Sequence, residues 1–220
     1  MVKCDKSPIA PPSLAQEKRK GKNGSYNKAD VVMQLIHDFH GKCYICELKS
    51  PSDIEVEHLV PKANDGPDDV TLQFDWNNLF LSCPHCNRVK NRQEFNGTII
   101  DCCITDPEIH VLFQYGTDDV IVTPLDNDIS SERTATLVYD VFNLKNSGIR
   151  IYASQYRLDK LKEEMNVFFK ALLKYDRSKS LFQRRKVEAL LRRSSAFAAF
   201  KRSYVRNNPK YPEFQQVVQL

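Results

Sequence analysis

The chain has little of what marks membrane, exported or fibrous proteins. No apolar run approaches the roughly 18 residues that a membrane-spanning helix needs. The stretch from Met1 to Lys22 is polar and basic and lacks the apolar centre of a secretory signal. Only 7 glycines and 11 prolines occur among 220 residues, which excludes a collagen-like or low-complexity chain. We therefore expect a globular, cytoplasmic protein of one domain with no membrane segment, or one domain with a helical annex.

Charge is distributed unevenly along the chain, although the net charge is only +4. An acidic middle is followed by a basic stretch from Arg177 to Arg206, in which Glu188 is the only acid. Such a block favours nucleic-acid binding, and a solvated helix face or a docking surface for a partner protein are the alternatives. The candidate phosphate contacts in this stretch are Arg184, Arg185, Arg192, Arg193, Lys201 and Arg202.

The seven cysteines are an odd number, and with no export signal they predict thiols or metal ligands rather than disulfides. Cys43-x-x-Cys46 and Cys83-x-x-Cys86 have the spacing with which two thiolate pairs hold one tetrahedral Zn²⁺ ion. Closed coordination by four cysteines leaves no open position, so this zinc site is predicted to be structural. The remaining cysteines, Cys4, Cys102 and Cys103, are interpreted as small apolar residues.

Hydrophobic periodicity predicts a mixed α+β protein with four regions. These are a flexible N-terminal arm over 1–24, a core over 25–97, a mixed α/β extension over 98–145, and basic C-terminal helices over 146–220. In the arm, the prolines of residues 7–13 argue against a helix. The expected elements are a helix over 27–39, strands over 54–60, 79–82, 109–113 and 120–122, a turn-rich loop over 61–69, and helices starting at 87 and over 136–144. Apolar residues spaced three and four apart predict two closing helices, one through Leu158–Leu172 and one through Leu190–Tyr204.

A three-part motif lies within and just after the two cysteine pairs. Its parts are Glu57-His58 with Pro61, then Asn77-Asn78-Leu79, then Asn87-Arg88-Val89-Lys90 after the last cysteine. This arrangement resembles the HNH endonucleases, with Asn87 in place of the final histidine. The resemblance implies a ββα-metal core of two short strands and a helix around one catalytic divalent ion, Mg²⁺ or Mn²⁺, and hydrolysis of phosphodiester bonds.

The resemblance also implies a role for each motif residue. His58 is the general base, for which its ordinary pKa is suited. Asn78 holds the imidazole, with the adjacent Asn77 as the alternative. Glu57 and Asn87 bind the catalytic ion. Glu57 is one methylene longer than the family's usual aspartate, so a solvent-facing Glu55 or Glu57 stays an alternative.

Four residues around the motif carry further expectations. Arg88 and Lys90 are candidate phosphate contacts at the start of the motif helix, with a solvated face as the alternative. His85, between two cysteines, is expected to be an exposed loop residue without a role. Trp76 is expected to pack beneath the site, with base stacking as the alternative.

Flanking segments narrow the resemblance. Lys6-Ser7-Pro8, Asp106-Pro107-Glu108 and Arg157 are similar to segments of the PtuB-type nucleases, which accompany the ATPase PtuA in Septu and retron-linked anti-phage systems. This implies DNA as the substrate, 5′-phosphate and 3′-hydroxyl ends, and a PtuA-like ATPase partner. Cleavage of RNA, such as tRNA, and a non-cleaving zinc module that binds nucleic acid or scaffolds an ATPase are the alternatives.

Overall fold

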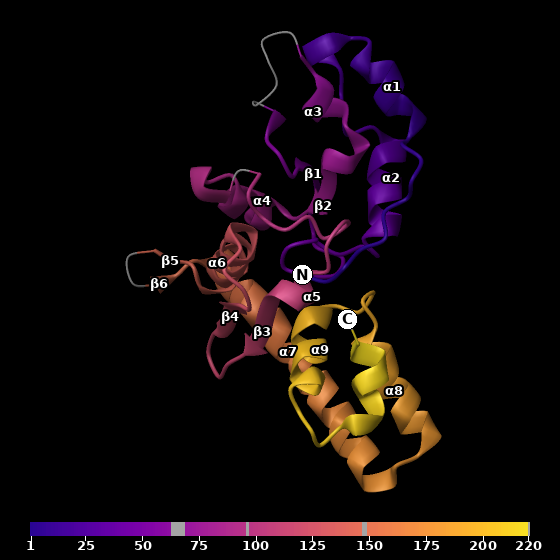
Figure 1. The fold of residues 1–220 in the computed structure, drawn as a ribbon, viewed down its shortest axis with the longest axis vertical. Helices are drawn as coiled ribbons and strands as arrows, with labels where there is room; N and C mark the ends of the chain where they lie inside the picture. Colours follow the sequence, from indigo (N-terminus) through magenta and orange to yellow (C-terminus); the bar gives the residue numbers. More distant parts are fainter. Residues whose placement is uncertain (63–68, 96, 147–148, 220) are drawn as a thin grey trace.

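The computed structural model describes residues 1–62, 69–95, 97–146 and 149–219, so most of the loop expected over 61–69 lies outside the described residues. The molecule is elongated, with the N-terminal half at one end and the last helices at the other (Figure 1). The helices are α1 (Pro12–Lys18), α2 (Ala29–Asp38), α3 (Thr71–Phe74), α4 (Pro84–Lys90), α5 (Pro107–His110), α6 (Ile129–Asn143), α7 (Tyr152–Ser178), α8 (Leu181–Leu191) and α9 (Ala198–Arg206). The strands are β1 (Glu55–His58), β2 (Leu79–Ser82), β3 (Val111–Tyr115), β4 (Val120–Pro124), β5 (Lys145–Asn146) and β6 (Ile149–Arg150).

The centre of the N-terminal half is a two-stranded sheet followed by a helix. β1 pairs antiparallel with β2, and His58 lies opposite Leu79. Every residue of β2 is buried, which agrees with the apolar run of its first three residues, 79–81. Pro84 is the first residue of α4, where its missing N–H costs nothing. The predicted α+β class and the ββα order are confirmed.

The N-terminal segment is packed, and the expectation of a flexible arm over residues 1–24 is wrong. Met1 and Val2 are buried, and Pro12 begins α1 as its first residue, a position that tolerates proline. The Lys6 ammonium lies 4.2 Å from the Trp76 ring centroid, and the Trp76 indole N–H donates to a main-chain carbonyl at 2.8 Å. Trp76 is buried beside the ββα unit, as predicted.

The last part of the chain is a helical layer in which α7 packs on α6 and α8. The single helix expected through Leu190–Tyr204 is wrong, because α8 and α9 are separate helices. Phe197 between them has a φ of +47°, its N–H donates to the Glu47 carbonyl at 3.2 Å, and its ring packs against Phe142. Phe197 is the N-cap of α9, so these long-range contacts lie where α9 starts, and a periodic sequence pattern does not reveal them.

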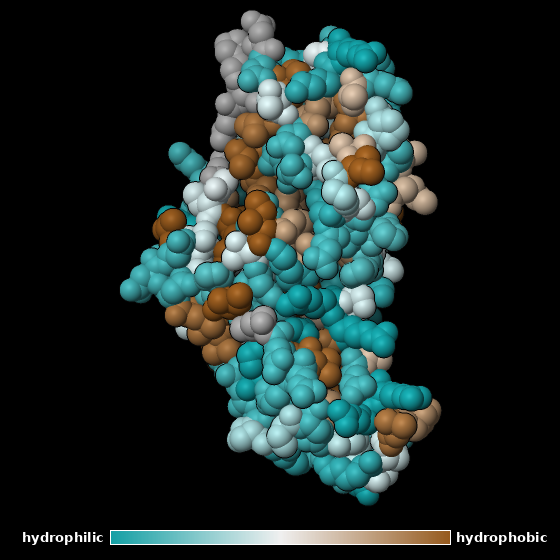
Figure 2. Space-filling model, turned by 45° about the vertical axis from the view of Figure 1, so that its right-hand side comes forward, coloured by the Kyte–Doolittle hydropathy of each residue, from teal (hydrophilic) through white to brown (hydrophobic). Residues whose placement is uncertain are grey.

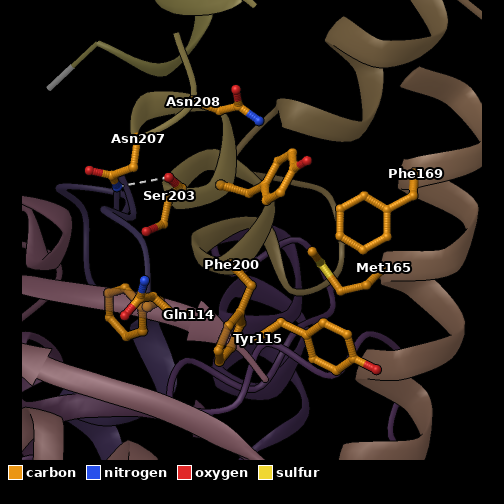
Figure 3. Close-up of a pocket in the computed structure, with 10 residues that line it drawn as sticks. Gln114, Tyr115, Met165, Phe169, Phe200, Ser203, Asn207 and Asn208 are labelled. Carbon is orange, nitrogen blue, oxygen red and sulfur yellow. Dashed lines mark hydrogen bonds between the residues drawn. The ribbon is translucent and has the colours of Figure 1, made fainter. Parts of the chain in front are cut away.

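A cavity of about 260 Å³ lies where β3, α7 and α9 meet (Figure 3). Its wall combines aromatic and sulfur-containing side chains with the polar side chains of Ser203 and Asn207. None of the residues predicted to be catalytic lines it.

Candidate functional site

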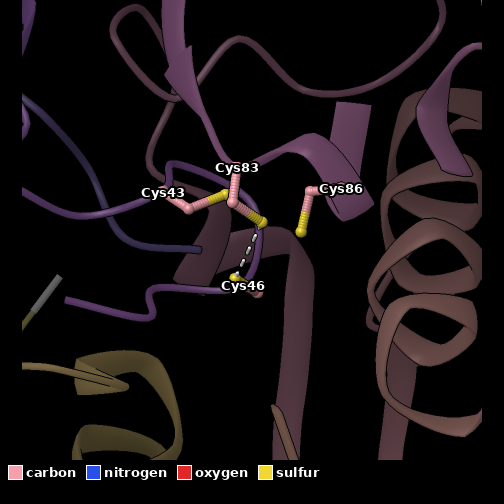
Figure 4. Close-up of side chains that lie close together, drawn as sticks. All are labelled: Cys43, Cys46, Cys83 and Cys86. Carbon is pink, nitrogen blue, oxygen red and sulfur yellow. Dashed lines mark hydrogen bonds between the residues drawn. The ribbon is translucent and has the colours of Figure 1, made fainter. Parts of the chain in front are cut away.

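The four cysteines of the two pairs converge in the interior. Their sulfur atoms all lie within 4.8 Å of one another, and the sulfurs of Cys46 and Cys83 are 4.0 Å apart (Figure 4). A tetrahedral Zn²⁺ with Zn–S bonds of about 2.3 Å requires S···S distances of about 3.8 Å. The donor set therefore fits zinc closely, and because all four side chains are buried, a bound ion has no open position for substrate.

A residue from the far helical layer contacts this cluster. The Arg157 guanidinium, on α7, donates to the Cys83 sulfur at 2.9 Å. Hydrogen bonds from the neighbouring cysteine thiols, together with the Arg157 charge, hold the pKa of Cys83 well below its usual range. A thiolate is the form that binds zinc, so Arg157 supports the cluster from outside. The spacing of the cysteines gave no sign of this contact.

His85 is buried, and the expectation that it is an exposed loop residue is wrong. Its Nε2 lies 3.0 Å from the Val141 carbonyl of α6, and burial lowers the pKa of its imidazole. Because Pro84 starts α4 one residue earlier, His85 belongs to a helix whose buried side faces α6.

His58 lies at the end of β1, half-buried. Its Nε2 is 3.1 Å from the Gln73 carbonyl, an acceptor, so Nε2 carries the proton in the neutral ring. Nδ1 is then the nitrogen with the lone pair, which is the protonation pattern a general base needs. The Tyr26 ring meets the imidazole edge to face, with 4.5 Å between centroids.

Asn78 is buried, but its carboxamide does not reach the imidazole, and the predicted contact is wrong for the described residues. It accepts from the Val60 N–H at 2.7 Å and donates to the carbonyls of Val60 and Leu72 at 2.9 and 3.0 Å. The side chain therefore closes the loop after β1 onto the turn that carries Gln73. The alternative, Asn77, has an exposed side chain.

Glu57 and Lys90 form a buried ion pair, with 2.5 Å between Oε1 and Nζ. The Tyr44 hydroxyl donates to the other carboxylate oxygen at 2.7 Å, and Lys90 also donates to the His58 carbonyl at 2.8 Å. Burial raises the pKa of Glu57, and the Lys90 charge opposes that shift. Lys90 is fully buried, so the expectation that it contacts phosphates is wrong; it fixes β1 against α4 instead.

Glu55, and not Glu57, meets Asn87. The Asn87 carboxamide donates to Oε2 of Glu55 at 2.6 Å, and both residues are half-buried. Strand alternation places the two glutamates on the same face of β1, but each is opposite a different turn of α4. Asn87 also borders a shallow cavity of about 220 Å³ together with Tyr26, His58, Lys62 and Asn91. Arg88 is exposed one residue further on, so its phosphate contact stays a prediction.

Three of the six basic residues singled out near the C-terminus are structural. Arg202 is buried and donates to both oxygens of the buried Glu108, at 2.9 and 2.8 Å. Lys201 is fully buried and pairs with Glu164 at 2.7 Å, while Arg193 pairs with Asp106. Hydrophilic residues cover most of the helical end on the face in Figure 2. The expected phosphate-binding role is therefore wrong for these three residues, because carboxylates of the same chain pair with their charges.

The remaining three occupy more exposed positions. Arg184 is half-buried and pairs with Glu188 at 2.8 Å. Arg185 and Arg192 are exposed. For all three, the role in phosphate binding stays a prediction.

Comparison with known proteins shows what the core is similar to. Residues 43–93 match the HNH endonuclease family model. A Septu protein PtuB of Bacillus thuringiensis is 29% identical over 107 residues, which cover 46% of this chain and 40% of that protein. A Septu protein PtuB of Bacillus mycoides (strain KBAB4) is 34% identical over 82 residues, covering 32% of this chain and 28% of that protein.

The matched region thus spans less than half the length of these relatives. No solved structure matches the chain significantly. No helix in the described part of the chain is long and apolar enough to cross a membrane. The region that resembles the HNH endonucleases, residues 43–93, carries both cysteine pairs and all three parts of the motif.

Proposed function

We propose that this protein is a metal-dependent endonuclease that hydrolyses phosphodiester bonds in DNA as part of an anti-phage defence complex. The observation that carries the proposal is that His58, Glu57 and Asn87 line one cavity of the ββα unit, where Asn87 also donates to Glu55, beside the closed cysteine cluster. A module that only binds or scaffolds needs the cysteines but not this polar set.

His58 is the proposed general base. The Gln73 carbonyl holds the proton on Nε2, so Nδ1 takes a proton from the attacking water. The imidazolium that forms keeps its hydrogen bond to that carbonyl. A positioned base of this kind contributes about 10²–10⁴-fold to the rate.

The donors around Asn87 fit a hard divalent cation. Mg²⁺ and Mn²⁺ prefer carboxylate and carbonyl oxygens and keep several waters. The bound ion would stabilise the charge of the pentacovalent phosphate. We propose Asn87 and Glu55 as its protein ligands, with the Asn87 oxygen turned towards the ion. This replaces the prediction for Glu57, whose two oxygens contact Lys90 and Tyr44.

Binding of Mn²⁺ to the metal-free catalytic site tests which of the two glutamates, Glu55 or Glu57, is a ligand. Mn²⁺ binding is measured by titration calorimetry on protein that keeps its zinc and has been freed of Mg²⁺. Glu55→Gln is expected to weaken the Mn²⁺ affinity at least tenfold. Glu57→Gln is expected to lower thermal stability and to leave Mn²⁺ affinity within a few-fold. The reverse pattern restores Glu57 as the ligand.

Matched DNA and RNA substrates test the activity itself. The purified protein, with Mg²⁺ or Mn²⁺, is expected to cleave DNA and to lose cleavage in EDTA. Cleavage of RNA alone would retain the mechanism and overturn the substrate. No cleavage of either, alone or with a PtuA-type ATPase, would favour the scaffold.

The proposed ATPase partner is supported by the similarity to proteins named Septu protein PtuB. Co-expression with a PtuA-type ATPase, followed by size-exclusion chromatography, tests it. A stable complex is expected, and separate elution of the two proteins would contradict the proposal.

A further inference from the structure

The segment before α2 reaches into the catalytic cavity. Tyr26 precedes the first residue of α2 by three positions and lines the same cavity as His58 and Asn87. Its ring lies 4.5 Å from the imidazole of His58, centroid to centroid, at an angle of 71°. No part of the HNH match, which starts at residue 43, includes this tyrosine.

Two contacts together fix the orientation of the imidazole. The Gln73 carbonyl holds Nε2, and the Tyr26 ring packs edge to face against the imidazole. The hydrogen bond at Nε2 alone would allow the imidazole to rotate about the axis of that bond, whereas an aromatic contact on the side of the imidazole opposes this rotation. Edge-to-face pairs of aromatic rings contribute energy beyond the area they bury, so the contact can hold a rotamer.

The same tyrosine holds a cation at the mouth of the cavity. The ammonium of Lys62 lies 4.7 Å from the Tyr26 ring centroid, in the geometry of a cation–π contact. Lys62 lines the cavity with His58, and among the described residues no carboxylate pairs with it. A lysine held beside the proposed base suits one anionic group of a substrate, and a phosphodiester supplies that group.

We propose that Tyr26 is a positioning residue that holds His58 and Lys62 in place, and that Lys62 binds a backbone phosphate of the nucleic acid. The inference rests on the proposed nuclease function for its kinetic consequences. It assigns to the N-terminal segment a direct part in the active site. The contact is made by the ring of Tyr26, so the hydroxyl group is not required.

Three variants and one control test this proposal. Tyr26→Phe keeps the ring, Tyr26→Ala removes it, and Lys62→Met removes the charge. Tyr152→Ala, at an 85% exposed position on α7, is the matched control. Zinc content and circular dichroism are measured for each, and Tyr26→Leu replaces Tyr26→Ala should that variant not fold.

Proton NMR of the free protein reads the contact directly. The imidazole protons of His58, identified by their absence in His58→Ala, carry a ring-current shift from Tyr26. We expect Tyr26→Phe to keep this shift and Tyr26→Ala to lose it. An unchanged His58 signal in Tyr26→Ala overturns the positioning role, and this holds even for a wild-type protein that cleaves nothing.

Cleavage kinetics separate the two functions of the tyrosine. Tyr26→Ala is expected to lower kcat about three- to tenfold, from the strength of an aromatic contact. Tyr26→Phe is expected to stay within about twofold. Lys62→Met is expected to raise KM with a smaller change in kcat. Equal loss in Tyr26→Phe and Tyr26→Ala, or an unchanged KM in Lys62→Met, contradicts the proposal.

Discussion

The cysteine cluster and the candidate catalytic region differ in how they are built. The cysteine cluster is closed and buried, and its four ligands come from two local Cys-x-x-Cys turns. The candidate catalytic region is open on one side, and its residues come from the segment before α2, from β1, from the loop after it and from α4. The comparison teaches that local spacing suffices to specify a closed structural site, whereas an open reactive site depends on contacts between distant segments.

Different buried polar residues support each of these two regions. Arg157 on α7 contacts the cysteine cluster. In the candidate catalytic region, Lys90 pairs with Glu57, and Asn78 holds the backbone of Val60. None of these three contacts follows from sequence spacing alone. Removing each support in turn therefore shows how far each region depends on the rest of the fold.

The largest effect is expected from breaking the cysteine cluster. Cys83→Ser removes a zinc ligand, and structural zinc contributes about 10–16 kcal/mol in small zinc domains. This exceeds or equals the whole stability of a typical domain, about 5–15 kcal/mol. We expect loss of bound zinc, measured by elemental analysis, and loss of the cooperative thermal transition. Cys103→Ser, outside the cluster, is the control and should retain about one zinc per chain; an unchanged melting temperature in Cys83→Ser contradicts this expectation.

A smaller but still large effect is expected from Lys90→Met. It leaves the carboxylate of Glu57 buried without its cation, which costs about 3–5 kcal/mol. Urea denaturation measures the loss, and adding Glu57→Gln should recover part of it. Arg88→Met, two residues earlier and exposed, should change stability by less than about 0.5 kcal/mol. Equal stabilities for the two single variants would mean that Lys90 does not hold β1.

Asn78→Ala is expected to have an intermediate effect. It removes the three hydrogen bonds that the Asn78 side chain makes with the half-buried backbone of Val60 and Leu72, at a cost of about 1–3 kcal/mol. Because the loop around His58 then loosens, the cleavage rate should also fall. The loss of rate should be smaller than or comparable with the loss in His58→Ala. Asn77→Ala is the neighbouring control, measured by the same denaturation and cleavage assays. A drop in activity without any loss of stability would point to direct contact with the imidazole.

The smallest effect is expected at the exposed end of the basic stretch. Arg185→Gln with Arg192→Gln removes two charges that are exposed in the structure. The slope of log affinity against log salt should fall by at most about two, roughly one per lost phosphate contact. Filter binding at several salt concentrations measures this slope. A much steeper fall would show that the helical end contributes more to nucleic-acid binding than its described surface indicates.

The sequence predicted the elements that local rules determine. The strand at 79–82 and the α+β class follow from composition and spacing, and the cysteine cluster from paired turns. It failed where a distant residue decides the outcome. Lys90 and Lys201 look like solvent-facing cations in the sequence, yet both are buried and pair with the carboxylates of Glu57 and Glu164. The same holds for Phe197, whose contact with Glu47 precedes the start of α9 inside a segment that periodicity would make one helix.

The catalytic predictions show the same limit. The motif located His58 and Asn87, since their positions follow from the resemblance. It could not tell which glutamate of β1 faces Asn87, because that depends on how α4 sits against the strand. Tyr26 was missed altogether, because it lies well before the motif and carries no pattern of its own.

The most direct test of the central claim is the cleavage rate of His58→Ala in parallel with His37→Ala, whose side chain is 81% exposed. We predict that His58→Ala loses about 10²–10⁴-fold in rate while zinc content and melting temperature match those of the wild type. His37→Ala should cleave normally. A His58→Ala protein that cleaves within a few-fold of wild type would contradict the assignment of His58 as the base, and rescue of its activity by added Mn²⁺ would make His58 a metal ligand instead.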